Sequence, residues 1–366
     1  MVPLLAGLIA TACVSNDAPE AEQGRRHVCD AVECDIELEH VVTLSDSFAP
    51  GAFTVGRPLW VQQDARGRFF LAASGLDQVL VFDSTGRFHS YIGRRGSGPG
   101  EFERATHIFT GHGGDSVYVA DVLLKRLTMI APDLSIARTR SLAYTPSLYM
   151  PDLVLDDGSF ILAVQVQTPD NIGYPIHRLD SVGAIVRSFG IDTPQFRPDL
   201  SRLLTRVVAP SRGGGIWAAA PGRYIIDRWD PASGRREARI AVPSAWFRES
   251  DRSDRQTEHP QPVIVGLWED EHSLLWVLLR DGNSDWRPPE LPVHAPHDPE
   301  SYSNKHDWVI EVIDPVSGRV VASRRFPEYI GYRPPTVLLV SIREIELAGV
   351  VLDVWRPVLQ PRAGSS

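Results

Sequence analysis

A short pattern recurs along this chain of 366 residues: a turn that contains Gly or Asp, followed at once by a strand-like apolar run. Turn signals directly before short apolar runs are typical of hairpins between short β-strands. The recurrence therefore constrains the chain to a repeat architecture built from β-strands. The five clearest copies of the apolar run are residues 69–72, 117–120, 160–163, 216–219 and 275–278.

A second signal, a strand that ends at an Asp with a Gly a few residues later, sets the length of the repeat. Asp accepts hydrogen bonds from the amides of the turn and Gly adopts positive φ, so we interpret these aspartates as turn residues. Successive members are about 50 residues apart, which is typical of a four-stranded propeller blade. A longer last interval indicates an insertion in the fifth unit. The members are Asp83, Asp133 (a degenerate copy), Asp180, Asp230 and Asp314.

The two ends of the chain complete one unit between them. Residues 337–340 and 350–355 fit the second and third strands of a last unit, but nothing after Leu359 can supply its fourth strand. Residues 36–44 alternate like a strand without a partner, and adding them to the last unit removes two exposed edges. We therefore expect an all-β fold, a six-bladed β-propeller whose last blade is closed by the N-terminal strand, with residues 329–333 as the first strand of that blade. A seven-bladed ring or a β-sandwich is the alternative.

One connector carries a family resemblance. Residues 91–102, Tyr-Ile-Gly-Arg-Arg-Gly-Ser-Gly-Pro-Gly-Glu-Phe, follow a blade that ends in Val-Phe-Asp-Ser-Thr-Gly-Arg, and this sequence resembles the NHL-type repeat of six-bladed β-propellers. The closing segment, residues 341–357, is similar to the final blade of exported bacterial propeller lipoproteins. The resemblance extends over residues 36–361 and implies a fold and a location only, because such proteins bind, scaffold or catalyse.

The N-terminus predicts export. Residues 2–12 form an apolar run that is too short to span a bilayer, and the run ends in Ala-Thr-Ala before Cys13. Residues 8–13 resemble a bacterial lipobox, which implies lipidation of Cys13; ordinary secretion with an incidental Cys13 is the alternative. We expect a lipoprotein of the bacterial cell envelope that faces the periplasm or the exterior. Its parts would be a signal peptide (1–12), a lipid-anchored polar tether (13–35), the propeller (36–361) and a tail (362–366).

The remaining cysteines are an even pair. Cys29 and Cys34 are the only others in the chain, and disulfides persist in exported proteins, so a bridge between them is the simplest prediction. A zinc site would need two more ligands, and no second cysteine pair exists.

Charge and loop lengths bear on partners. With 37 basic and 46 acidic residues the net charge is -9, which argues against a nucleic-acid binder. Long loops in compact domains are often functional, and the long segments of this chain are connectors expected on one face, the conventional top face. They are residues 93–104, 165–177, 190–205, 243–262 and the blade-five insertion 281–307.

These loops supply the candidate binding residues for a protein or glycan partner in the cell envelope. We predict a non-catalytic binding role, with no cofactor. Trp246 and Trp286 could be aromatic anchors, although such residues often pack between blades. The candidates are Arg94, Arg95, Trp246, His259, Trp286, His294, His297 and His306.

The alternative is a metal-dependent hydrolase or lyase, and a purely structural envelope protein is a third class. Similar six-bladed enzymes of lactonase or amidating-lyase type hold calcium or zinc in the channel, at the starts of the inner strands. Those positions here read near Pro58, His107, Asp152, Arg206, Val263 and Tyr329. One His and one Asp are few ligands for either metal, and His294 and His297 of the insertion lack the fixed geometry of a helical motif.

Overall fold

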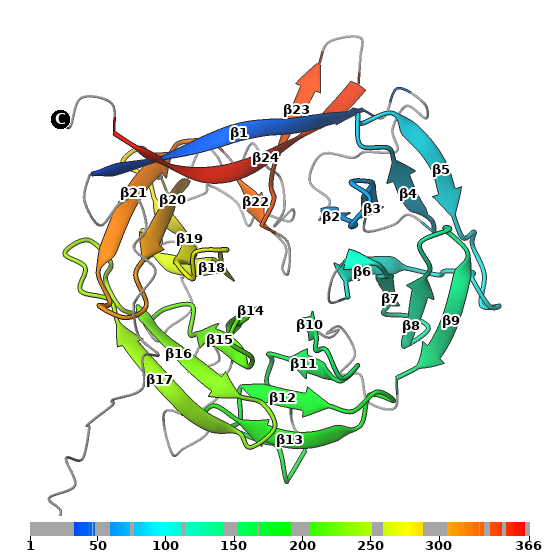
Figure 1. Cartoon of the computed structure of the whole chain (residues 1–366), viewed down its shortest axis with the longest axis horizontal. Coiled ribbons are helices and arrows are strands. Elements are labelled where there is room, and N and C mark those ends of the chain that lie inside the picture. The colour runs from blue at the N-terminus through cyan, green and yellow to red at the C-terminus, as the bar shows by residue number, and fades with distance from the viewer. Residues whose placement is uncertain are drawn as a thin grey trace, which may run out of the picture.

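The computed structural model of the chain describes residues 33–45, 47, 59–73, 77–111, 114–142, 152–166, 168–191, 205–250, 259–287, 306–328, 330–332, 337–345 and 349–362. Within these ranges the strands form six four-stranded antiparallel sheets arranged in a ring (Figure 1). The expected all-β, six-bladed β-propeller is thereby confirmed. No helix in the described ranges is long and apolar enough to cross a membrane.

Five blades use consecutive strands, with the first strand of each blade innermost in the ring (Figure 1). Blade 1 is β2 (Leu59–Gln63), β3 (Phe69–Ala73), β4 (Val79–Phe82) and β5 (Phe88–Ile92). Blade 2 is β6 (Ala105–Thr110), β7 (Val117–Asp121), β8 (Arg126–Ile130) and β9 (Ile136–Ser141). Blade 3 is β10 (Leu153–Val154), β11 (Phe160–Leu162), β12 (Ile176–Leu179) and β13 (Ile185–Phe189).

Blade 4 is β14 (Val207–Pro210), β15 (Ile216–Ala219), β16 (Ile225–Asp230) and β17 (Arg235–Ala241). Blade 5 is β18 (Val263–Glu269), β19 (Leu275–Gly282), β20 (His306–Ile313) and β21 (Val320–Phe326). Blade 6 joins both ends of the chain, as β22 (Gly331–Tyr332), β23 (Leu339–Ile345), β24 (Gly349–Pro361) and the outermost strand β1 (Cys34–Ser45).

The N-terminal strand closes the ring as the sequence predicted. β1 pairs with β24 from Cys34 opposite Pro361 to Ser45 opposite Val351, with one irregularity near His40. Inside this ladder the buried carboxylate of Asp353 accepts a 2.6 Å hydrogen bond from the Thr43 hydroxyl and pairs with Arg343. Burial opposes ionisation, yet these contacts hold the pKa of Asp353 below its usual range. The closure therefore combines strand pairing with contacts to one buried carboxylate.

Two predicted boundaries need correction. The polar tether was expected to reach residue 35, but β1 already begins at Cys34, because the backbone of Cys34 pairs with Pro361. The insertion was expected to start at Asp281 and end at Asp307, but these two residues are cross-strand partners within β19 and β20. Cys34 is buried and disulfide-bonded. Its predicted partner Cys29 and the predicted lipidation site Cys13 lie outside the described residues. The Cys29–Cys34 bridge and the lipidation of Cys13 therefore stay predictions.

The core lies between the blades. Each of six apolar clusters joins two neighbouring blades, so every sheet contributes one face to each neighbour. β3 shows the reason: Phe69 and Leu71 pack toward blade 6, whereas Phe70 and Ala72 pack toward blade 2. Strand side chains alternate between faces, so a short run that is apolar throughout serves two seams at once. This explains why the recurrent sequence runs are apolar at every position.

Candidate functional site

In the described residues, the inner strands begin and the outermost strands of blades 1 to 5 end on one face of the ring, so the predicted loops leave the blades there. We call this the connector face, and the opposite face the turn face. The predicted channel-mouth positions fall where inner strands start: His107 is within β6, Asp152 and Arg206 directly precede β10 and β14, and Val263 begins β18. Pro58 and Tyr329 lie outside the described residues.

Asp152 and Arg206 share one backbone anchor at the channel mouth. The Asp152 carboxylate accepts a 2.7 Å hydrogen bond from the Ala163 amide, and the Arg206 amide donates to the Ala163 carbonyl at 3.3 Å. The Arg206 guanidinium donates to the Gly190 carbonyl at 3.2 Å and is buried. Burial raises the pKa of Asp152 from 3.8 to about 7. This carboxyl can therefore exchange a proton near neutral pH.

The other described candidate of this set, His107, contacts an aromatic side chain of blade 1. Its ring lies against the Trp60 ring, with the centroids 4.4 Å apart. No group of three or more His, Cys, Asp or Glu side chains suited to hold a metal ion occurs among the described residues. His294 and His297 fall in a range the structure does not describe.

The Gly-rich connector after blade 1 is held by its own side chains. Glu101 accepts hydrogen bonds from the Gly98 amide at 2.8 Å and from Arg94 at 2.8 Å, and these contacts lower its pKa. The Phe102 ring is fully buried against Gly93, where φ is +82° and a Cβ would come within 2.4 Å of the ring. Arg95 is 85% exposed and lies 3.9 Å from Asp77. The two candidate arginines therefore project from a rigid loop.

Residues from two connectors meet beside blade 5. His259, from the 243–262 connector, has its Nε2 3.1 Å from the Asn283 carbonyl, and its ring lies 5.6 Å from that of Trp286 in a T-shaped contact. Gly282 permits this approach, because a Cβ there would come within 2.4 Å of His259 Cε1. His306 is the cross-strand partner of Gly282. We call His259, Gly282, Asn283, Trp286 and His306 the blade-five corner.

A charged clamp supports this corner. Asp281 and Asp307 are direct cross-strand partners, and Arg325 of β21 forms 3.0 Å ion pairs with both carboxylates. These two carboxylates raise the pKa of Arg325, against the opposing effect of its burial. The same guanidinium lies 5.4 Å from the centre of the Trp246 ring. The ends of the insertion are thus fixed where they leave the sheet.

Trp246 packs between blades 4 and 5. Its indole donates a 3.0 Å hydrogen bond to Glu311, which also accepts from Tyr224 and, at 3.3 Å, from Ser323. Glu311 is buried, and burial with this neighbouring carboxylate raises the pKa of Tyr224 well above its usual value. The Trp246 side chain therefore has a structural role, and its predicted part in binding stays a prediction.

Sequence reasoning missed the buried polar residues. Asp121 is fully buried and accepts four backbone hydrogen bonds, from residues 103, 104, 123 and 124, which fix the connector into blade 2. His177 is fully buried, with ring nitrogens 2.7 Å from Ser188 Oγ and 3.0 Å from the Val164 carbonyl. Its burial lowers its pKa to about 4. The only available signal was a polar residue inside or directly after an apolar run.

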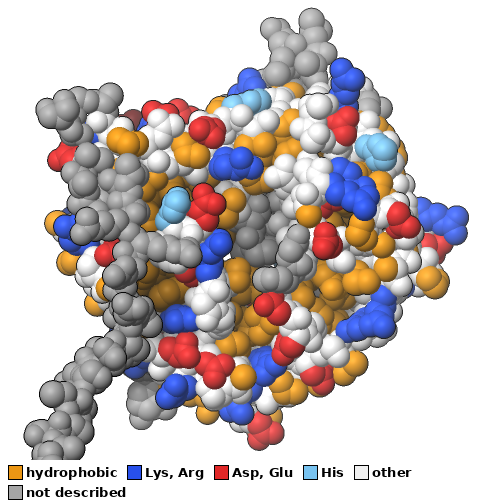
Figure 2. Space-filling model, in the orientation of Figure 1, with side chains coloured by type: hydrophobic (Ala, Val, Ile, Leu, Met, Phe, Trp, Pro, Cys, Tyr) orange, Lys and Arg blue, Asp and Glu red, His pale blue; other side chains and the backbone are white. Residues whose placement is uncertain are grey.

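The surface of the ring mixes charge types. On the face toward the viewer, Figure 2 shows basic and acidic side chains interspersed in small groups, with apolar side chains between them. This face thus offers short-range polar and apolar contacts rather than one field of a single sign.

Comparisons with known proteins agree on the architecture. A family model, DUF5128, described as a 6-bladed beta-propeller, matches residues 61–158. No curated protein matches the chain. A crystal structure of a DUF4221 family member from Bacteroides vulgatus aligns with a TM-score of 0.60 at 10% identity, covering 90% of this chain and 99% of that one.

Two further solved structures give the same outline. A Bacteroides fragilis protein, whose name proposes that it is exported, aligns with a TM-score of 0.55 at 14% identity, over 89% of this chain and 95% of its own. Virginiamycin B lyase from Staphylococcus aureus aligns with a TM-score of 0.46 at 11% identity, over 87% and 99%, which is too distant to support an argument. The chain is similar to these proteins in fold, and it is an all-β, six-bladed β-propeller.

Proposed function

We propose that this propeller is a non-catalytic binding protein that holds a protein or glycan partner on its connector face, at the blade-five corner. The main observation in support is that His259 and Trp286 come from two separate loops and meet there, with their ring centroids 5.6 Å apart. The clamp of Arg325 with Asp281 and Asp307 fixes the strands beneath them. Aromatic side chains held on a rigid base lose little conformational freedom on binding, which is typical of interface anchors.

A clean deletion tests this proposal. Because Gly282 and His306 are direct partners, a two-residue Asn-Gly turn can join them and replace residues 283–305. The shortened protein should keep the unfolding transition of the full chain and lose binding on a glycan array and in cross-linking to envelope proteins. Trp286→Ala should weaken the same binding at least tenfold, by about 1.4 kcal/mol or more. Leu123→Ala, an exposed apolar side chain on the same face of blade 2, is the matched control. Unchanged binding after the deletion would show that the corner is not the site.

We further propose that the protein is exported and anchored through a lipid on Cys13. The apolar run at residues 2–12, the disulfide at Cys34 and the name of the Bacteroides fragilis structure support this proposal. Growth with a labelled fatty acid should label the protein, and Cys13→Ser should remove the label. A labelled Cys13→Ser protein would contradict lipidation at this residue.

A metal-dependent hydrolase or lyase is the second candidate, with His107 and Asp152 near the starts of inner strands. Metal analysis of the purified full chain separates the two functions. The binding proposal predicts no stoichiometric calcium or zinc, whereas about one ion per chain supports the enzyme.

A further inference from the structure

A cavity opens on the turn face, at the seam between blades 2 and 3. Its volume is about 290 Å³. Blade 2 contributes Tyr118, Met129 and Arg138, one from each of its three outer strands, and blade 3 contributes Val154 and Phe160 on either side of the β10–β11 turn. The cavity thus lies on the opposite face of the ring from the blade-five corner.

The blade 1–2 seam shows why this cavity exists. In blade 1, Phe70 of β3 occupies the place that Tyr118 of β7 has in blade 2, two residues after the turn into the second strand. The Arg68 guanidinium lies 5.6 Å from the centre of the Phe70 ring and covers it. Ser116 stands at the position of Arg68 in blade 2. The short serine side chain cannot extend over Tyr118, so the space stays open.

The arginine of blade 2 lies instead on its outer strand. Cross-strand pairing aligns Tyr118 with Met129, and Met129 with Arg138. The corresponding row in blade 1 ends in Ser90. Arg138 is exposed and has no hydrogen-bond or ion-pair partner in the described part of the chain. A guanidinium is therefore available at the rim of an apolar cavity.

The neighbouring charges are already satisfied. Asp157, the acidic residue of the lining, pairs with Arg178 and accepts a hydrogen bond from the Ser159 hydroxyl. Arg140 donates to the Ser181 carbonyl at 2.6 Å, which ties blade 2 to blade 3. The rim thus carries an excess of positive charge on a protein whose net charge is -9.

The apolar part of the cavity wall includes one ring that is held in place by packing. The Tyr118 ring stacks on Phe109 at 5.8 Å with an interplanar angle of 12°, so the Tyr118 side chain is held in place from behind. Met129 is adaptable in shape and contacts aromatic rings well. The volume is at the small end of ligand pockets, which suits one ring system with a short substituent.

We propose that the blade 2–3 cavity binds an aromatic carboxylate, with the ring against Tyr118 and Phe160 and the carboxylate on the Arg138 guanidinium. Planar guanidinium groups bind carboxylates with two parallel hydrogen bonds, and such charged bonds are stronger than neutral ones. The ligand can be a free small acid or the C-terminal aromatic residue of a polypeptide, because both present the same chemistry.

Titration calorimetry on the full chain tests this site. Indole-3-propionate should bind, and indole-3-propionamide, which lacks the charge, should bind at least about tenfold more weakly. Arg138→Gln should reduce the affinity for the acid to that for the amide. The matched control is Arg187→Gln, because Arg187 has the same place in the outer strand of blade 3 and does not line the cavity.

A second set of titrations, with a peptide, distinguishes a free small acid from the C-terminus of a polypeptide. Tighter binding of the tetrapeptide Ala-Ala-Gly-Trp than of its C-terminal amide and of indole-3-propionate would identify a polypeptide C-terminus, whereas binding of indole-3-propionate alone would identify a free acid. No binding of either acid at millimolar concentration, or equal affinity of Arg138→Gln and the unaltered protein, would overturn the proposal. Neither outcome depends on the blade-five corner.

Discussion

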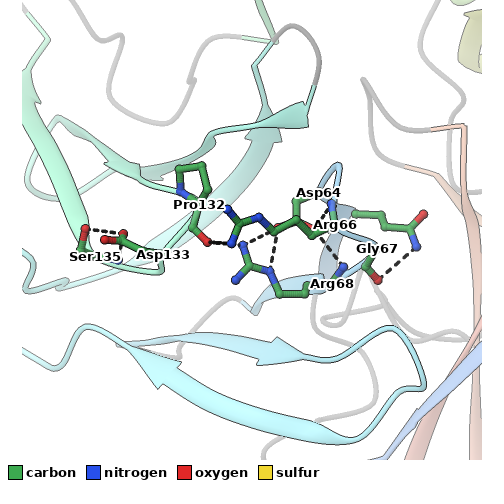
Figure 3. Close-up of polar contacts among 8 residues, drawn as sticks. Asp64, Arg66, Gly67, Arg68, Pro132, Asp133 and Ser135 are labelled. Carbon is green, nitrogen blue, oxygen red and sulfur yellow. Dashed lines mark hydrogen bonds and ion pairs between the residues drawn. The ribbon is translucent and has the colours of Figure 1, made fainter.

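The blade 1–2 and blade 2–3 seams use the same backbone position in different ways. Figure 3 shows Arg66 and Arg68 from the β2–β3 turn of blade 1 donating to the Pro132 carbonyl of blade 2, at 2.9 Å and 2.8 Å. The equivalent carbonyl in blade 3 is that of Ser181, and it accepts from Arg140 of the outer strand β9. Inner arginines fill a seam, whereas an outer arginine spans it and leaves its inner part open. One seam is therefore structural, and the other can bind a ligand.

The largest expected difference between the seams concerns their carboxylates. Asp64 is buried, accepts from Arg68 at 2.8 Å and 2.6 Å, and orients it toward Pro132 (Figure 3). Asp64→Ala should lower the free energy of unfolding by about 4 kcal/mol, because it leaves a half-buried guanidinium unpaired. Asp157→Ala, in the blade 2–3 seam, should cost less than about 1 kcal/mol because that carboxylate is 53% exposed. Urea unfolding measures both, and equal losses would contradict the contrast.

The next expected effect is a pH dependence at the other end of blade 3. The pKa of Asp152 is raised to about 7, so between about pH 4 and 7 the folded state holds a proton that the unfolded state has lost. This carboxyl therefore lowers the stability as the pH rises through that window. Asp152→Asn should remove the loss, and the variant should gain about 3 kcal/mol over the unaltered protein between pH 4 and 7. Unfolding curves in EDTA at several pH values measure the difference in unfolding free energy between the variant and the unaltered protein. A difference that does not change with pH would contradict the raised pKa of Asp152.

His177 gives the opposite sign in the same blade. Its pKa is lowered to about 4, so the unfolded state takes up a proton first as the pH falls below 6.5. Stability from this residue is complete above about pH 6.5 and is lost toward pH 4, by about 3 kcal/mol. His177→Gln should abolish this loss, whatever its effect at neutral pH. In the unaltered protein, the pH dependences of stability that come from Asp152 and His177 oppose each other. Replacing either residue should therefore reveal the pH dependence that comes from the other.

The smallest expected effects concern the bonds that cross the two seams at the surface. Arg66→Gln and Arg140→Gln each remove one hydrogen bond to a carbonyl, from Pro132 and from Ser181. Each should change the stability by only about 0.5 kcal/mol, because these guanidinium groups remain in contact with water. Thermal unfolding of both variants checks this, and a loss above about 2 kcal/mol would mean that the seams depend on these surface bonds.

Local chemistry explains how far the sequence determined the fold. The turn aspartates predicted at Asp83 and Asp180 accept amides from residues two and four positions later, as the Asp and Gly spacing requires. Strand β22 at Gly331–Tyr332 falls within the predicted range 329–333. These features depend on neighbours in sequence, so a single sequence is sufficient to predict them.

The site residues depend on distant partners. The pair of His259 and Trp286 joins two loops, and the buried ring of His177 is hydrogen-bonded to Ser188 in the next strand. No spacing rule signals such contacts. The cavity is an intermediate case. The sequence shows Arg68 in blade 1 and Ser116 in blade 2, but only the strand register, which aligns Phe70 with Tyr118, shows that the two residues occupy equivalent positions.

Filling the open seam tests the central contrast most directly. Ser116→Arg places an arginine where blade 1 has Arg68, and Ser116→Ala is the matched control. Calorimetry should show that Ser116→Arg loses at least tenfold in affinity for indole-3-propionate, a change of about 1.4 kcal/mol or more, while Ser116→Ala binds like the unaltered protein. Equal affinity of Ser116→Arg and Ser116→Ala, with both variants folded, would contradict the account.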